Sequence, residues 1–208
     1  MVPSKAALVL FRIIVASTML GATALAEPAP KAATAVLAGG CFWCVEHDMR
    51  QLSGVTEAVS GYSGGSRPNP TYEDYHDVDA ANPVPHLEAV RVTYNPSVLS
   101  YEKLLDYYFH HIDPTDGGGQ FCDRGPAYRP AVFVGSEAER KVAEAKKAEV
   151  AKLLNQKVAV EILDAKTFWP AEGYHQDYAV KNPIRYKYYR WNCDRDQRVE
   201  AVWKRAQQ

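Results

Sequence analysis

The order of the apolar segments constrains the fold of this chain most strongly. Short apolar runs that suit strands are followed by segments of helical character, and clusters of glycine, proline and asparagine separate them. The expected strands are Thr34–Leu37, Val55–Tyr62, Leu87–Tyr94, Ala131–Val134 and Val158–Leu163, and the expected helices are Cys41–Gln51, Tyr101–His111 and Glu137–Leu154. This order predicts an α/β (α+β) fold, a two-layer sandwich of helices on a mixed or antiparallel sheet with a ferredoxin-like core.

Three segments lack a periodic pattern. Ser66–His86 and Asp113–Arg129 are long loops rich in turn-forming residues, and such loops in compact domains tend to carry function. The remainder, Phe168–Gln208, is aromatic and charged, which predicts short helices wrapped around the core.

The N-terminus has the pattern of a secretory signal peptide. Lys5 and Arg12 precede an uncharged apolar stretch that ends in Ala24-Leu25-Ala26. A retained membrane anchor is the alternative, but the stretch is shorter than the roughly 20 residues that a span needs. We therefore expect cleavage after Ala26, a linker over 27–33 and a single catalytic domain over 34–208 in an exported, soluble protein. Loss of the two basic residues changes the net charge from −1 to −3, which gives no indication of a nucleic-acid partner.

The chemistry-bearing segment reads Gly-Gly-Cys-Phe-Trp-Cys-Val-Glu from Gly39 to Glu46. Cys41 follows an expected strand and a glycine turn and stands at the first turn of an expected helix. Unpaired N–H groups and the helix dipole stabilise a thiolate there, so we expect a lowered pKa and a reactive sulfur. Phe42 and Trp43 could form an apolar wall for a methyl group. The alternative interpretation makes Cys41 a structural half-cystine with the two aromatic residues in the core.

This segment resembles the active-site signature of the A-type peptide methionine sulfoxide reductases, which act on the S epimer. Further blocks match the family in order along the chain. They are Gly61-Tyr62-x-Gly64-Gly65, Pro68-Asn69-Pro70-Thr71-Tyr72, His86-x-Glu88-Ala89-Val90-Arg91-Val92, His111-x-Asp113-Pro114, Asp123-Arg124-Gly125-x-x-Tyr128-Arg129, Ala171-Glu172-x-Tyr174-His175-Gln176-Asp177-Tyr178 and Asn182-Pro183. The resemblance spans most of the chain after the signal segment.

The resemblance implies a role for each of the matched polar residues. Cys41 attacks the sulfoxide sulfur, and Glu88 supplies a proton to the sulfoxide oxygen as a neutral acid. Tyr72 and Tyr128 donate hydrogen bonds to the same oxygen, and Asp123 organises water and the polar side of the substrate. Phe42 and Trp43 hold the methyl group. Judged on the strand pattern alone, Glu88 could instead face solvent.

The product on Cys41 is a sulfenic acid, which a second thiol must resolve to a disulfide. The chain has four cysteines, and the order of preference is Cys193, then Cys44, then Cys122. Cys44 stands where the commonest form of the signature has glycine. It gives a C-x-x-C spacing, which is also typical of thiol–disulfide oxidoreductases. A third hypothesis is a non-catalytic binding domain stabilised by disulfides.

The expected partners are oxidised proteins or peptides as substrate, with free methionine sulfoxide accepted as well, and a thioredoxin-like reductant. We expect no cofactor, no nucleic acid and a monomer. Neither the adjacent pair His110-His111 nor the other histidines give a metal-ligand spacing, and His175 is better interpreted as a structural hydrogen-bonding residue. In a Gram-negative bacterium the compartment is the periplasm, and the task is repair of exported proteins after oxidative stress.

Overall fold

A computed structural model of the chain describes residues 31–205. The expected signal peptide and most of the expected linker lie outside these residues. Within the described part, no helix has the length and apolar character needed to cross a membrane.

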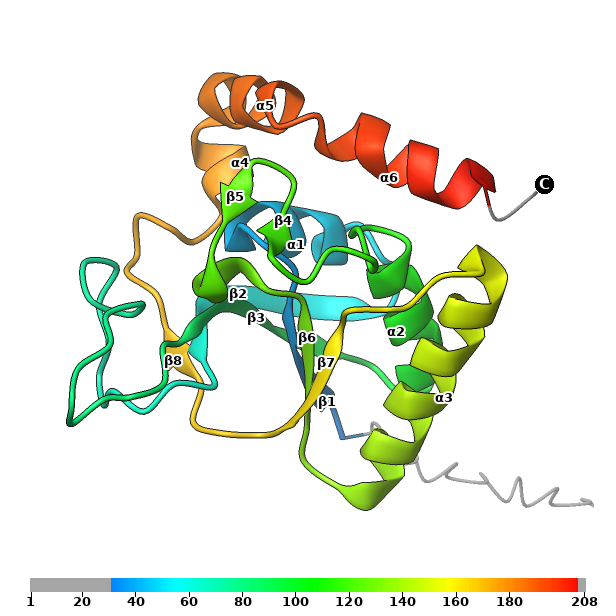
Figure 1. Ribbon diagram of the computed structural model, residues 1–208, viewed down its shortest axis with the longest axis horizontal. Coiled ribbons are helices and arrows are strands. Elements are labelled where there is room, and N and C mark those ends of the chain that lie inside the picture. Colours follow the sequence, from blue (N-terminus) through cyan, green and yellow to red (C-terminus); the bar gives the residue numbers. More distant parts are fainter. Residues whose placement is uncertain (1–30, 206–208) are drawn as a thin grey trace, which may run out of the picture.

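A six-stranded mixed sheet forms the centre of the molecule (Figure 1). Its strands are β1 (Ala33–Ala38), β2 (Val55–Ser63), β3 (Leu87–Tyr94), β6 (Ala131–Val134), β7 (Glu161–Asp164) and β8 (Trp169–Pro170), in the spatial order β7-β6-β1-β3-β2-β8. Only β6 and β7 pair in parallel, and every other neighbouring pair is antiparallel. The four inner strands follow the ferredoxin-like order, so the expected fold class is confirmed.

Three helices pack on one face of this sheet: α1 (Phe42–Arg50), α2 (Tyr101–Phe109) and α3 (Glu137–Leu154). Ser100 and Ser136 cap α2 and α3, because each hydroxyl accepts the N–H of the residue three positions on. Side chains such as Leu37, Leu104 and Val132 are fully buried between the two layers. A smaller apolar cluster on the opposite face, around Phe133, is covered by the segment that carries Phe168.

The C-terminal part forms α4 (Tyr178–Lys181), α5 (Pro183–Asn192) and α6 (Arg195–Arg205). Figure 1 shows α5 and α6 running along the edge of the molecule beside α1. This part confirms the expectation of short helices, although β8 within it adds an edge strand to the sheet.

Two expectations about element boundaries were wrong. The strand expected at Val158–Leu163 begins at Glu161, because the N–H of Ala159 bonds to the carbonyl of Pro114 and not to β6. The second long loop contains a hairpin of β4 (Gly119–Gln120) and β5 (Asp123–Arg124) and a turn of 3-10 helix, η1 (Pro126–Tyr128). The first difference depends on a contact with a distant segment, whereas the hairpin is a local pairing too short for strand alternation to show.

Candidate active site

The two thiols of the C-x-x-C segment lie together at the start of α1. Cys41 is the residue immediately before the helix, and its carbonyl accepts the N–H groups of Cys44 and Val45 at 3.1 and 3.3 Å. This turn brings the two free sulfurs into hydrogen-bond contact with each other. Both side chains are buried, with 6% of Cys41 and 1% of Cys44 exposed.

Gly40 makes this turn possible. Its φ of +78° lies in the left-handed region, and a Cβ atom there would be 2.5 Å from the Cβ of Gln120. A side chain at this position would therefore push Cys41 away from the hairpin that carries Gln120.

The charges around the two sulfurs differ from the expectation. Burial raises the pKa of Cys41 well above its ordinary value, and the hydrogen bond with Cys44 and the charges of Cys44 and Glu88 raise it further. The hydrogen bond from Cys41 lowers the pKa of Cys44, and the guanidinium groups of Arg195 and Arg190 act in the same direction. The prediction of a lowered pKa at Cys41 was therefore wrong for the substrate-free site. The lowering effect of the helix N-terminus on the pKa of Cys41 is smaller than the raising effects of burial and of the second thiol.

Glu88 lies on β3 and points to the start of α1. Its two oxygens accept the N–H of Phe42 at 2.9 Å and the hydroxyl of Tyr75 at 3.0 Å. Only 2% of Glu88 is exposed, so the solvent-facing alternative is wrong. Burial raises the pKa of Glu88 to about 8, against the lowering effect of the two hydrogen bonds. A carboxyl group with this pKa is mostly protonated at neutral pH and can donate a proton.

Three tyrosines surround this carboxyl group. The hydroxyl of Tyr75 lies 3.4 Å from that of Tyr128, and the ring of Tyr72 stacks against Tyr75 at 5.8 Å. Burial and the charge of Glu88 raise the pKa of Tyr72 to about 12, so its hydroxyl remains a donor. Tyr72 is 38% exposed and stands at the open side of the site. Its backbone N–H is fixed by Glu172 at 2.9 Å.

The two aromatic residues of the signature differ in burial and share His175 as a neighbour. Phe42 is 1% exposed and packs against Tyr62 and His175, with ring centroids 5.9 and 4.9 Å apart. Trp43 is half-buried and stacks on Tyr178 at 3.7 Å. Its indole N–H donates to Nδ1 of His175 at 3.0 Å, which places the ring proton of a neutral His175 on Nε2. The structural role expected for His175 is confirmed.

Glu46, the last residue of the signature, is structural in its contacts. Its carboxylate accepts the hydroxyl of Ser60 at 2.5 Å and the N–H of Asp177 at 2.8 Å. It therefore ties α1 to β2 and to the segment before α4.

Asp123 lies on β5 and faces α5. It accepts the hydroxyl of Tyr189 from α5 at 2.5 Å, and burial raises its pKa. The Tyr189 hydroxyl also forms a hydrogen bond with the sulfur of Cys41, and this is the contact that lowers the pKa of that thiol.

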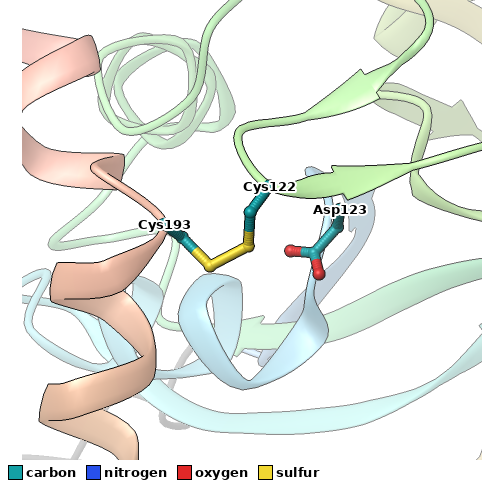
Figure 2. A group of neighbouring side chains, drawn as sticks. All are labelled: Cys122, Asp123 and Cys193. Atoms are coloured by element: carbon teal, nitrogen blue, oxygen red, sulfur yellow. A yellow bond between two sulfur atoms is a disulfide. The ribbon is translucent and has the colours of Figure 1, made fainter.

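The other two cysteines form a disulfide between Cys122 and Cys193, which Figure 2 shows beside Asp123. These three residues are the one group within residues 31–205 whose composition could suit a metal ion. Because the two sulfurs are bonded to each other, they are not thiolate ligands in this state. For the same reason Cys193 is not free to resolve Cys41 in this state, whereas Cys44 is free, and the identity of the resolving thiol stays a prediction.

Comparison with known proteins places this geometry in a family. Residues 33–207 match the model of the family described as peptide methionine sulfoxide reductase. The chain belongs to this family. This membership disfavours the two rival hypotheses, a thiol–disulfide oxidoreductase and a non-catalytic binding domain.

Similar proteins carry the family name. Peptide methionine sulfoxide reductase MsrA 2 from Caulobacter vibrioides is 53% identical over 189 residues, which are 90% of this chain and 94% of that protein. The structure of Mxr1 from Saccharomyces cerevisiae in reduced form has a TM-score of 0.66 and 33% identity, with 74% of this chain and 87% of that chain covered. Mxr1 in complex with Trx2 has a TM-score of 0.50 and 28% identity, with 76% and 91% covered.

The structure brings together the residues that the resemblance implied, together with Cys44, where the chain departs from the commonest family signature. Cys41, Cys44, Glu88, Tyr72, Tyr128 and Asp123 all lie around one centre. Tyr75 and Tyr189 were missed. Tyr75 follows Tyr72 by three residues, and this one-turn spacing could have pointed to it. Tyr189 lies in a run of aromatic and basic residues, and nothing in the sequence distinguishes it from its neighbours.

Proposed function

We propose that this protein reduces methionine S-sulfoxide in peptides and proteins, with Cys41 as the nucleophile and Glu88 as the acid. The observation that carries the proposal is a free Cys41 thiol beside a buried carboxyl group whose pKa is about 8. A nucleophile and a neutral acid are the two groups that sulfoxide reduction requires of a protein.

In the first step the sulfur of Cys41 attacks the sulfoxide sulfur. A bond forms between the two sulfurs while the sulfoxide oxygen takes the proton of Glu88, and the thiol proton of Cys41 restores the acid. The hydroxyl then transfers to the Cys41 sulfur as the bonds from the substrate's sulfur to oxygen and to Cys41 break, so that methionine leaves and Cys41 becomes a sulfenic acid. Tyr72 and Tyr128 are placed to donate hydrogen bonds to that oxygen, and Tyr75 orients Glu88 through its bond at 3.0 Å. Trp43, the less buried member of the aromatic pair, supplies the apolar contact for the substrate's methyl group.

In the second step Cys44 resolves the sulfenic acid. Its sulfur attacks that of Cys41, a disulfide forms, and the hydroxyl leaves as water. Cys44 is suited to this because it is free, contacts Cys41 and carries a lowered pKa beside Arg190 and Arg195. A thioredoxin-like protein then reduces the Cys41–Cys44 bond. The solved complex of Mxr1 with Trx2 supports a partner of this kind.

A single-turnover experiment tests the reaction. The protein with Cys41 and Cys44 reduced, and freed of reductant, is given the separate R and S epimers of a blocked methionine sulfoxide. We expect about one equivalent of methionine from the S epimer only, and a new Cys41–Cys44 disulfide by mass spectrometry. Absence of methionine from both epimers would contradict the proposal.

We further propose that the chain is exported, with residues 1–26 removed and residues 34–208 acting as one catalytic domain. The basic start, the apolar stretch and the Ala24-Leu25-Ala26 site support this. The proposed task is repair of oxidised exported proteins, in the periplasm if the source is Gram-negative. Expression of the whole chain in such a bacterium, followed by fractionation and N-terminal sequencing, tests it. A cytoplasmic protein that retains Met1 would contradict it.

A further inference from the structure

The tip of the β4–β5 hairpin docks on the junction between α5 and α6 with three consecutive side chains. The ring of Phe121 lies under the guanidinium group of Arg195 at 4.5 Å. Cys122 is bonded to Cys193, and Asp123 accepts the hydroxyl of Tyr189 at 2.5 Å. Figure 2 shows the covalent member of this contact, with the hairpin on one side and the end of α5 on the other.

The disulfide matters because α5 is otherwise weakly packed. Tyr186 is its one buried residue among those described, while Ile184, Tyr188 and Trp191 are between 65% and 84% exposed. The disulfide joins the residue that ends α5 to a strained hairpin tip, since Phe121 has a φ of +56° without being glycine. With so little buried area, α5 is held in place by specific links, which include the disulfide and the ion pair of Arg190 with buried Asp48 at 2.7 Å.

Tyr189 connects the end of α5 to the nucleophile Cys41. It lies one helical turn before Cys193, whose N–H bonds to its carbonyl at 3.0 Å. Its ring meets Trp43 edge-on at 5.9 Å, and its hydroxyl contacts both Asp123 and the sulfur of Cys41.

We propose that Tyr189 is a further catalytic residue, whose hydroxyl holds the sulfur of Cys41 as the nucleophile, and that the Cys122–Cys193 disulfide is the positioning element that keeps Tyr189 there. The hydroxyl has one proton. Once Asp123 is protonated and donates to the Tyr189 oxygen, that proton is available to the Cys41 sulfur. A hydrogen bond to the charged sulfur favours Cys41 over Cys44 as the thiol that attacks. This proposal rests on the proposed role of Cys41.

The test compares the rate of methionine formation in a single turnover. We expect Tyr189→Phe to slow it about tenfold, the factor that corresponds to one lost hydrogen bond to a charged group. Tyr188→Phe, an exposed change on the same helix, is the matched control and should leave the rate unchanged. Alkylation of Cys41 by iodoacetamide, mapped by mass spectrometry, should slow in parallel because the thiolate is less populated. If Tyr189→Phe caused a structural defect that left the Cys41 sulfur unaffected, the rate of Cys41 alkylation would not change.

The role of the disulfide is tested by non-additivity. The Cys122→Ser/Cys193→Ser variant, with circular dichroism to check its fold, should slow methionine formation, and adding Tyr189→Phe should slow it little further. An unchanged rate in Tyr189→Phe overturns the catalytic role of Tyr189. Two results would overturn the positioning role of the disulfide. One is a combined variant whose rate loss equals the product of the two separate losses, and the other is an unchanged rate in the variant without the disulfide. A wild-type protein that forms no methionine counts against the proposed function and not against Tyr189 alone.

Discussion

At the scale of single residues, the site separates two sulfurs that local chemistry would make alike. Both belong to the same turn of α1 and both are buried. Cys41 faces Glu88, while Cys44 faces Arg195 and Arg190. The surroundings therefore place Cys41 beside the carboxyl group that can protonate a sulfoxide, and they suit Cys44 to a later attack as a thiolate.

Replacement of Cys44 separates the first step from resolution. We expect Cys44→Ser to form about one equivalent of methionine and then to stop, with a sulfenic acid at Cys41 that dimedone traps. Cys193→Ser should continue to turn over with a thioredoxin-like reductant, although more slowly. The reverse result would restore Cys193 as the resolving thiol. The measurement is methionine formed per enzyme, with and without that reductant.

The pKa of Glu88 predicts a pH dependence of the first step. Burial raises this pKa to about 8, so the protonated acid is present below that value and is lost as pH rises through it. The single-turnover rate should therefore change little with pH near pH 6–7, where Glu88 is protonated, and fall above about 8. Glu88→Gln cannot donate an acidic proton and should be slower by roughly 10²–10⁴-fold without this limb. Stopped-flow measurement across pH checks both, and an alkaline limb that persisted in Glu88→Gln would belong to another group.

At the scale of elements, the turn between β1 and α1 sets the position of the nucleophile. Gly40 has a φ of +78° and lies against Gln120, while Glu46 ties the same helix to Ser60 and Asp177. The start of the helix is therefore held from both sides, by the hairpin and by β2.

A side chain at Gly40 should destabilise this turn. Gly40→Ala places a Cβ 2.5 Å from Gln120 Cβ in a disfavoured backbone conformation, and we expect a loss of about 2 kcal/mol in the free energy of unfolding. Gly173→Ala is the matched control, because no atom lies within 4 Å of its Cβ position. Urea unfolding of both variants measures the difference. Equal free energies of unfolding in the two variants would show that the hairpin can move away from a side chain at residue 40 without loss of stability.

At the scale of the whole molecule, the Cys122–Cys193 disulfide links two segments that are 71 residues apart in sequence. It closes the end of the second long loop, β6, α3, β7, β8, α4 and α5 into one covalent ring. The same bond thus serves the fold and, in our proposal, the position of Tyr189.

Removal of this disulfide should lower stability. For a loop of 71 residues, chain entropy corresponds to about 4 kcal/mol, and measured values for disulfides are typically 2–4 kcal/mol. The Cys122→Ser/Cys193→Ser variant should therefore unfold at a lower urea concentration than the wild type. A midpoint that did not move would mean that the non-covalent contacts of Phe121 and Asp123 already fix the hairpin.

The sequence by itself determined the elements and the family. The periodicity of Leu87–Tyr94 and Glu137–Leu154 gave β3 and α3 their correct bounds, because strand alternation and helix capping are local properties. The signature around Cys41 and the matching blocks identified the family and most of the site residues. The expected signal peptide, outside the described residues, stays a prediction.

Only the tertiary structure decided which thiols are free, where the protons lie and what holds the site together. The Cys122–Cys193 bond, the contact of Tyr75 with Glu88 and the contact of Tyr189 with Cys41 each join segments that the sequence leaves unrelated. The raised pKa of Cys41 has the same origin, since burial and neighbouring charges come from distant parts of the chain. Local patterns record backbone preference and periodicity, whereas pKa and disulfide pairing depend on distances that exist only after folding.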